Sequence, residues 1–353
     1  MSEMMKINYL PAPTWNWLKM NVAETEKPDG LKAAAPAVEK PEGVVQALSA
    51  EFHGGIPTGM GADMDALMDA AGAEYTVFAA TAGDETPEPV RLGFTYEGVQ
   101  ASAARIGLEA EEGAGLLAIM DFAGDASGAA AVQTRVGVGK GAVVKLVQIQ
   151  HFGEGLTFFN DIGVDCAEGG RFELIQVVIG GKETYMGVRD ELAGGGSSFK
   201  SDLGYLLTGN DKLDLNFTAS HTGKKTDSQI SVNGVLRDSA SKLFRGTIDF
   251  RKGASGATGD EKEDVLLLSE GVVNQTIPLI LCAEEDVEGG HGATIGRVDE
   301  ELLFYLESRG IPEEAVYEML ATARIDAVGR LIPDERARRL VSSCIGSEEE
   351  EDD

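Results

Sequence analysis

His291 is the residue of this chain whose type and surroundings most directly suggest chemistry. It opens the string HGATIGRVDEELLFYLESRGIP, residues 291–312, and is flanked by Gly290 and Gly292. A neutral imidazole is the commonest metal ligand among protein side chains. From residue type alone, His291 is a candidate metal ligand presented by a glycine-flanked turn. The alternative is a turn histidine that is hydrogen-bonded to the backbone.

The three cysteines are the other residues that could bind a metal. Their odd number and wide spacing predict no disulfide framework. No CxxC pair exists, so the chain cannot build a structural zinc site or a four-cysteine cluster in the usual way. Cys282 ends the apolar run IPLILC and is kept as a secondary ligand candidate, with a buried strand cysteine as the alternative. Cys166 and Cys344 are interpreted as structural.

An amphipathic helix is predicted directly after this histidine, over 298–310. Its sequence, VDEELLFYLESRG, begins with acids that suit the positive N-terminal end of a helix and ends with a glycine that suits its stop. Two further helices are predicted from Pro312 and from Pro333. Such a helical tail has apolar faces to bury, on the body of the protein or on a partner. The apolar stripe of the first helix comprises Leu302, Leu303 and Leu306.

Short β-rich runs occupy the middle of the chain, from about Ser127 to residue 252. Each alternates or is rich in β-branched residues, and each is bounded by Gly, Asn, Asp or Ser. No helix of convincing length interrupts them. Two all-β architectures fit this pattern, a sandwich or barrel and a solenoid, and periodicity alone does not choose between them.

The N-terminal part is predicted to be mixed. Residues 8–21 form an extended arm whose Trp15 and Trp17 are expected to fasten the N-terminus to the body. Residues 22–47, rich in Ala, Glu, Lys and Pro, are expected to form a loosely ordered linker. The elements predicted after it are a short helix from Gly59 and strands over 74–80, 90–96 and 115–122.

The charge balance excludes several classes of partner. The 353 residues include 59 acidic and 30 basic side chains, which gives a net charge of −29. Such a surface repels the phosphates of nucleic acid and the headgroups of an anionic membrane. The final six acids, Glu348 to Asp353, predict a disordered tail. Because no signal peptide or bilayer-spanning run is present, we expect a cytoplasmic protein.

The string HGATIGRVDEELLFYLESRGI resembles the C-terminal signature of the SufB/SufD family of iron–sulfur cluster assembly proteins. In that family a His-Gly-Ala-Thr segment leads to an acidic helix start, a Phe-Tyr-Leu segment and Ser-Arg-Gly-Ile. Upstream, DVLLLSEGVVNQTIPLILCAEEDVEGG is similar to the preceding family segment. The resemblance extends over about 210–320 and more weakly over 127–210, and the Trp-rich opening resembles that of SufD-like members.

This resemblance implies the fold. The family core is a right-handed parallel β-helix, a solenoid, with a mixed N-terminal segment and a helical C-terminal segment. It implies four regions in this chain: an N-terminal arm, linker and mixed α/β segment (1–125), a β-helix core (126–290), a C-terminal helical ATPase-docking segment (291–346) and an acidic disordered tail (347–353).

The resemblance also implies a function without catalysis by this chain. Family members are scaffolds that pair through their β-helices and dock through C-terminal helices on SufC, an ABC-type ATPase. The partners expected here are a SufC-type ATPase and either a SufB-type homologue or a second copy of this chain. The expected ATPase contacts are Leu303, Phe304, Tyr305, Ser308 and Arg309. The alternative is that Leu303 and Phe304 pack on the β body.

His291 matches the family histidine at the paired interface, where a nascent cluster forms. SufD-like sequences often carry a cysteine close to this histidine, and here Gly289 and Gly290 occupy those positions. The resemblance therefore implies that this chain contributes one ligand to a shared site. It implies a transient iron–sulfur cluster at a subunit interface and no cofactor held stably by the chain alone.

Two other functions remain open at the level of the sequence. A β-helical carbohydrate-active enzyme fits an acidic solenoid, but such enzymes need a groove of acids, bases or calcium ligands. A homodimeric scaffold that works without SufB fits the same residues as the heterodimeric one. An exposed groove would favour the first, and a protein-sized apolar patch would favour a scaffold.

Overall fold

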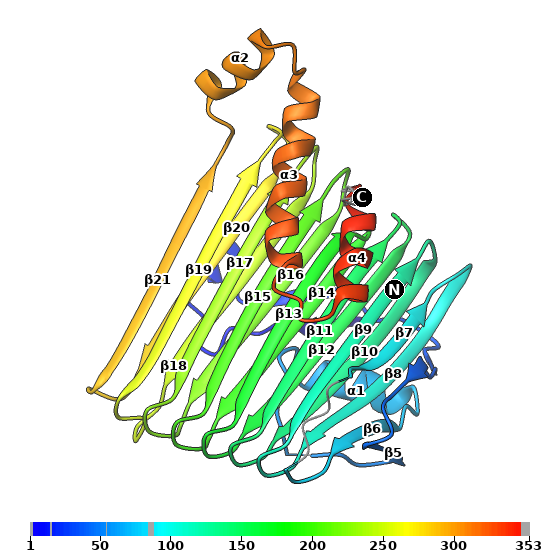
Figure 1. Ribbon diagram of the computed structural model, residues 1–353, viewed down its shortest axis with the longest axis vertical. Helices are drawn as coiled ribbons and strands as arrows, with labels where there is room; N and C mark the ends of the chain where they lie inside the picture. The colour runs from blue at the N-terminus through cyan, green and yellow to red at the C-terminus, as the bar shows by residue number, and fades with distance from the viewer. Residues whose placement is uncertain (1–2, 15, 54, 84–87, 347–353) are drawn as a thin grey trace, which may run out of the picture.

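Two long sheets face each other and form the body of the molecule. The computed structural model describes residues 3–14, 16–53, 55–83 and 88–346, and 52% of the chain is in strands and 14% in helices. Successive strands alternate between the two sheets, so each coil adds one strand to each, and about eight coils stack into a parallel β-solenoid (Figure 1). The parallel β-helix expected from the resemblance is confirmed.

From β6 onward, each strand pairs in parallel with the strand two places later in the chain, and β5 and β4 pair antiparallel with β6 and β7. Sheet I runs, in spatial order, β20 (Val273–Cys282), β18 (Ser241–Phe250), β16 (Lys212–His221), β14 (Glu183–Leu192), β12 (Leu156–Cys166), β10 (Ser127–Val138), β8 (Val99–Ala110), β6 (Tyr75–Ala80) and β5 (Val44–Ser49), with β3 (Lys32–Ala33) beside β8. Sheet II runs β21 (Val287–Gly296), β19 (Ala257–Leu267), β17 (Asp227–Leu236), β15 (Ser198–Leu207), β13 (Arg171–Gly180), β11 (Val143–Phe152), β9 (Gly115–Gly124), β7 (Val90–Thr95) and β4 (Ala37–Glu39).

Inward-facing side chains of the two sheets form the main core. Because every second residue of a strand points inward and the strands are in register, like side chains stack from coil to coil. The rings of Phe172 of β13 and Phe199 of β15, for example, are ladder partners and stack with their centres 5.8 Å apart. Polar side chains are buried among them: Gln148 accepts hydrogen bonds from Gln176 and Asn160, both of 2.7 Å.

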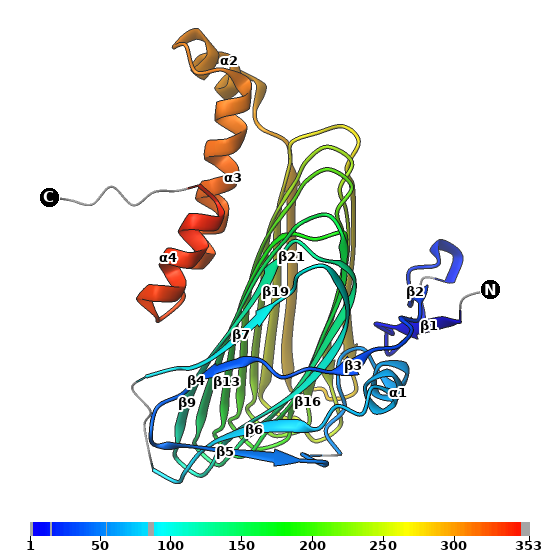
Figure 2. The same cartoon turned by 90° about the vertical axis from the view of Figure 1, so that its right-hand side faces the viewer.

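The helix α1 (Ala62–Ala70) covers the outer face of sheet I. Met64, Leu67 and Met68 are buried against that sheet, which confirms the predicted helix and its apolar face. On the opposite side of the solenoid, α3 and α4 cover sheet II, so the two outer faces are covered by segments from the two halves of the chain (Figure 2).

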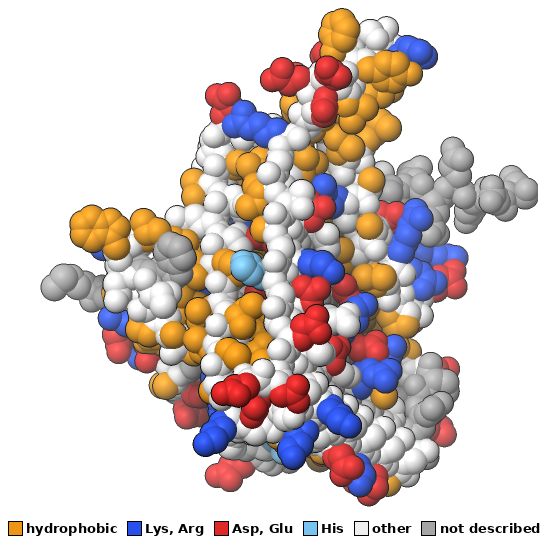
Figure 3. All heavy atoms as spheres, turned by 90° about the vertical axis from the view of Figure 1, so that its left-hand side faces the viewer, with side chains coloured by type: hydrophobic (Ala, Val, Ile, Leu, Met, Phe, Trp, Pro, Cys, Tyr) orange, Lys and Arg blue, Asp and Glu red, His pale blue; other side chains and the backbone are white. Residues whose placement is uncertain are grey.

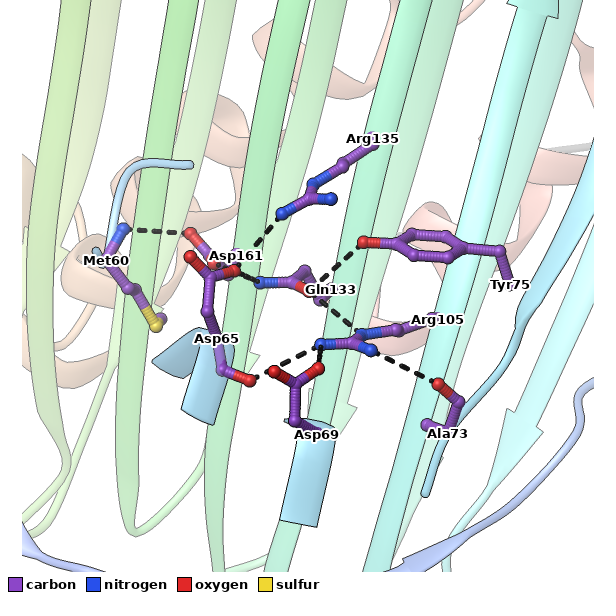
Figure 4. A network of polar contacts seen from close by, with 9 residues as sticks. All are labelled: Met60, Asp65, Asp69, Ala73, Tyr75, Arg105, Gln133, Arg135 and Asp161. Carbon is purple, nitrogen blue, oxygen red and sulfur yellow. Dashed lines mark hydrogen bonds and ion pairs between the residues drawn. The ribbon is translucent and has the colours of Figure 1, made fainter. Parts of the chain in front are cut away.

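A polar network fixes α1 to the strands beneath it (Figure 4). Arg105 of β8 donates to Asp69 at 2.7 Å, and Gln133 of β10 donates to Asp65 at 2.8 Å and to Asp161 of β12 at 3.0 Å. Burial raises the pKa of Asp161 to about 6. Since every helix carboxylate in this network meets a donor from the sheet, the network sets the position of α1 along three strands.

The N-terminal arm packs beside α1 on the same sheet. β1 (Met4–Ile7) and β2 (Ala23–Glu26) form an antiparallel pair, joined through the short 3-10 helix η1 (Asn16–Leu18). Arg245 of β18 is fully buried and donates to the carbonyl of Met20 at 2.7 Å and to Asp214 at 2.6 Å. Asn8 donates to the same carboxylate at 2.7 Å, so buried polar contacts anchor the arm.

The tryptophan expected to fasten the arm does not do so. Trp17 is 95% exposed, and the apolar contacts of the arm come from Leu10 and Met20, which pack on Ile277 of β20. Trp15 lies outside the described residues. The prediction for Trp17 was wrong because polar anchors and smaller apolar side chains already hold the arm.

Residues 22–47 are not a linker. They contain β2, β3, β4 and most of β5, and the partners of these strands lie mostly far away in the sequence. Because the strands are short and polar, the local sequence did not identify them as strands. The parallel ladders also begin before residue 126, in β6, and continue past residue 290 to Gly296. The expected acidic tail, 347–353, lies outside the described residues.

Three helices follow the solenoid: α2 (Glu300–Ser308), α3 (Glu313–Gly329) and α4 (Glu335–Cys344). Ile325 and Val328 of α3 and Val341 of α4 pack on isoleucines and valines of sheet II. Val316 of α3 is buried, whereas Met319 is 59% exposed, because the buried face of the helix continues through Ala321, Ile325 and Val328. No helix among the described residues is long and apolar enough to cross a membrane.

Gly187 lies where the backbone of the N-terminal segment closely approaches the solenoid, since a Cβ there would lie 2.5 Å from the backbone nitrogen of Met60. Gly187→Ala is expected to lower the free energy of unfolding by about 1–3 kcal/mol, because backbone must move. Urea unfolding measures this. The control is Gly43→Ala, where a Cβ meets nothing within 4 Å, and equal losses in the two variants would contradict the packing described here.

Candidate functional site at the open end of the solenoid

The two ends of the solenoid differ. At the N-terminal end, the sheets finish with the short antiparallel strands β5 and β4. At the C-terminal end they finish with β20 and β21, two strands of full length that have, within the described residues, a partner strand on one side only. A long free edge presents unpaired backbone N–H and C=O groups and is a template for another chain.

This open end is also accessible at the level of side chains. No residue of β21 is buried, and Ile277 is the one buried residue of β20. Figure 3 faces this end and shows hydrophobic side chains beside the narrow, glycine-rich β21. Val273 and Ile295 on the terminal strands are 48% and 47% exposed. An apolar surface next to free strand edges is typical of a protein interface.

His291 lies in the middle of β21, so the expectation that it sits in a turn was wrong. The Gly-His-Gly sequence is compatible with an extended strand at an edge, where small neighbours leave the imidazole accessible. Its partner in the ladder is Glu261 of β19, and the same row continues through Ile230 and Ser201, whose side chains are buried in the interior. His291 is therefore the exposed last member of an inward-facing row.

Cys282 is the last residue of β20 and is exposed, which differs from the usual buried strand cysteine. Its thiol donates to the carbonyl of Glu284 at 3.0 Å. Cys166 is buried and Cys344 is half-buried. The part of the chain that the structure describes holds no group of three or more His, Cys, Asp or Glu side chains that could bind a metal ion. Any metal at His291 thus needs ligands from elsewhere.

A buried polar cluster lies directly beneath the open end. Lys242 of β18 forms an ion pair with Glu263 of β19, and both side chains are about fully buried. Thr276 of β20 donates to Glu263 at 2.6 Å and accepts from Lys242 at 3.0 Å. Glu261, two residues before Glu263, is 3% exposed, and burial followed by the charge of Glu263 raises its pKa to about 8.

The helix α2 stands away from the solenoid and contacts α3. Asp299 caps it by accepting from the backbone nitrogens of Glu301 and Leu302. None of its residues is buried: Phe304 is 73% exposed and Tyr305 is 51% exposed. The alternative that Phe304 packs on the β body is therefore wrong.

The other residues expected to contact an ATPase lie on the same short helix or at its end. Leu303 is half-buried, Ser308 donates to the carbonyl of Tyr305 at 2.7 Å, and the guanidinium of Arg309 lies 5.0 Å from the centre of the Tyr305 ring. The helix thus presents exposed aromatic side chains, with Arg309 at its C-terminal end, that the rest of the described chain leaves accessible.

The buried histidine His221 has a structural role. It bonds to Thr226 and Ser228, both at 2.8 Å, and burial lowers its pKa to about 4. Its ring is therefore neutral at physiological pH and has both nitrogens engaged, which leaves no lone pair for a metal. His291 is the histidine of the described chain that combines exposure with a free strand edge.

The comparison with known proteins identifies the family. Residues 94–324, well over half of the chain, match the family described as "SUF system FeS cluster assembly, SufBD core domain". The chain belongs to the SufB/SufD family. The matched region of this family covers the solenoid from β7 to the end of β21 and continues through α2 into α3.

Curated relatives agree with this assignment. The iron–sulfur cluster assembly protein SufD of Bacillus subtilis is 35% identical over 152 residues, which cover 42% of this chain and 35% of the relative. A SufBD family protein of Staphylococcus haemolyticus is 28% identical over 201 residues, or 57% of this chain and 43% of the relative. One of Mycobacterium bovis is 33% identical over 120 residues, or 34% and 14%. The matches span less than half the length of each relative.

Sequence analysis missed the buried polar cluster. The segment GDEKED in β19 is so highly charged that it predicts a solvent-exposed strand. In the structure, however, Glu261 and Glu263 point into the solenoid. The available signal was the register: Glu261 and Glu263 are placed in the interior row once β19 is paired with β17 and β21.

Glu261→Gln is expected to stabilise the chain. Between its ordinary pKa of 4.5 and the folded-state pKa of about 8, the folded chain holds a proton that the unfolded chain has lost, so stability falls as pH rises through this window. The glutamine removes this loss. The variant's gain in the free energy of unfolding over the wild type is near zero at pH 4.5 and complete above pH 8. There it reaches a few kcal/mol, because each tenfold change in proton affinity corresponds to about 1.4 kcal/mol. Urea midpoints at pH 5 and pH 8.5 measure it.

The matched control is Glu263→Gln, on the same strand and the same face. It leaves Lys242 buried without its charged partner and is expected to destabilise the chain by about 3 kcal/mol. If both variants lose stability to the same extent, the two carboxylates do not differ in the way described.

Proposed function

We propose that this chain is a non-enzymatic scaffold subunit of the iron–sulfur cluster assembly machinery. It pairs through the open end of its solenoid with a SufB-type homologue or a second copy of itself, and it docks through α2 on a SufC-type ATPase. The observation that carries this proposal is a family solenoid that ends in two full-length free strands, one of which bears the exposed His291.

Strand pairing explains the open end. A partner that adds its own terminal strands to β20 and β21 satisfies their free backbone groups and covers Val273 and Ile295. The N-terminal arm widens this surface, because it packs on Ile277 of β20 and exposes Trp17 and Leu18 nearby. Measuring the native mass of the chain with and without a SufB-type homologue distinguishes a heterodimer from a homodimer.

The paired interface supplies what His291 lacks. One imidazole cannot hold a cluster, and the described residues offer no three-ligand site, so the remaining ligands come from the partner. The cluster is cargo: it forms transiently at the interface and is passed on. The free thiols of this chain suit the reducing cytoplasm, where such assembly operates.

His291→Ala is expected to lower the yield of reconstituted cluster in the paired complex by about tenfold or more, because a ligand is lost. The yield is followed by the visible absorption of the cluster under anaerobic conditions. His151→Ala, at an exposed position of β11 remote from the open end, is the matched control. A wild-type yield in His291→Ala would remove this residue from the mechanism.

Phe304→Asp is expected to weaken capture by a co-expressed SufC-type ATPase by about tenfold or more, because an exposed aromatic anchor becomes a charge. Binding is measured by pull-down and by titration with purified ATPase. Val99→Asp replaces another exposed apolar residue, on β8, and serves as the control. Equal capture of both variants and of the wild-type chain would contradict docking through α2.

A carbohydrate-active enzyme is not favoured. The open groove over the outer face of sheet II, of about 670 Å³, contains the acids Asp202, Asp227, Asp260 and Glu288. Asp202 pairs with Lys200 at 3.1 Å, Asp260 pairs with Lys262 at 3.0 Å, and Asp227 accepts from the hydroxyl of Thr258, so most of these acids are already engaged.

A further inference from the structure

Glu261 is a largely buried carboxyl group to which no hydrogen-bond donor is assigned. It lies in the middle of β19 and is 3% exposed, and within the described residues the charge of Lys242 acts on it without a direct hydrogen bond or ion pair. Burying a polar group without a hydrogen bond costs on the order of 1–3 kcal/mol, and more for a charge. Glu263, two residues away on the same face, shows that this strand can satisfy a carboxylate fully.

The surroundings of Glu261 are shaped to admit its carboxyl. Across the interior, Gly246 of β18 leaves the space that the carboxyl occupies, because a Cβ there would lie 1.9 Å from the nearer carboxyl oxygen. The fold therefore accommodates this carboxyl by means of a glycine while leaving it unpartnered.

His291 is the neighbour of Glu261 toward the open end. The two residues are partners in the ladder between β19 and β21, so they share the inward face, and adjacent strands lie about 4.8 Å apart. The residues on either side of His291 are Gly290 and Gly292, and no residue of β21 is buried. An ion that enters at the open end thus meets an imidazole first and a carboxyl one strand deeper.

We propose that Glu261 and His291 bind the same ferrous ion during cluster assembly, so that this chain supplies an oxygen and a nitrogen ligand rather than one histidine alone. The inference rests on the proposed function and deepens it. Mixed imidazole and carboxylate ligation suits ferrous iron. Coordination forms a bond between a carboxylate oxygen and the metal, and the proton of the buried acid passes to solvent.

This assignment gives the carboxyl of Glu261 a direct partner. Lys242 compensates the charge of Glu261 only from a distance, because its ammonium group is paired with Glu263, whereas a bound divalent ion compensates that charge directly. Two ligands remain fewer than a complete site, which agrees with the lack of a three-ligand group among the described residues. The other coordination positions stay open for the partner subunit or for sulfide.

The test uses Co²⁺ as a spectroscopic probe for the ferrous ion. It is titrated anaerobically into the full chain, in the assembly in which the chain purifies, for the wild type, Glu261→Gln, His291→Ala and the double variant. Each single variant is expected to lower the affinity for Co²⁺ by about tenfold or more, and the double variant to add little to either. Glu261→Gln is also expected to change the d–d absorption of the bound Co²⁺, because an oxygen ligand is lost.

The control is Glu288→Gln, an exposed carboxylate of β21, which is expected to bind Co²⁺ like the wild type. Wild-type affinity and spectrum in Glu261→Gln, with weakened binding in His291→Ala, would overturn the role of Glu261 and leave the proposed function intact. Unchanged binding in His291→Ala would overturn both. Should Glu261→Gln fail to fold, Glu261→Asp retracts the carboxylate and is expected to show the same loss of affinity.

Discussion

A parallel solenoid has no strand of its own to hydrogen-bond the outer edge of its last coil, and this constraint organises the whole molecule. Each coil is hydrogen-bonded by the next, so every strand edge is covered except at the two ends. At one end the chain turns β4 and β5 antiparallel and finishes with short strands. At the other end it stops with β20 and β21 at full length. The surface that needs a partner is therefore fixed by the fold before any side chain is considered.

The interior changes character towards that open end. Deeper in the solenoid, aromatic and aliphatic rows dominate, and Gln148 accepts hydrogen bonds from Gln176 and Asn160. In the last coils the interior also holds the ion pair of Lys242 with Glu263, the carboxyl of Glu261 and an amide at Asn274 with no hydrogen-bond partner in the described structure. A core selected for stability alone would replace such groups with apolar ones. On the proposed function, their place beneath the free edges puts them next to the paired interface.

Local patterns predicted the local elements well. The helix α1 with its buried methionines and the start of α2 at Asp299 are visible in composition and capping residues. Local sequence patterns could not distinguish a solenoid from a sandwich, because the difference depends on which strands pair. The strands within 22–47 were missed for a related reason, since most of their partners are distant in the sequence. The ligand candidate at residue 291 came from a resemblance, whereas Glu261 required the register, since an acid that alternates along a strand looks exposed in the sequence.

The two functional surfaces are joined by very little chain. Residues 297–299 alone separate the end of β21 from the start of α2, and Val298 packs against the small cluster of Val235, Leu266, Leu268 and Ala321 that joins sheet II to α3. On the proposed function, a displacement of α2 by a docked ATPase acts almost directly on the strand that carries His291. An edge strand bonded on one side only yields more easily than an inner strand, because fewer hydrogen bonds hold it. The exposure of His291 and its proposed coupling to α2 therefore both follow from the free edge of β21.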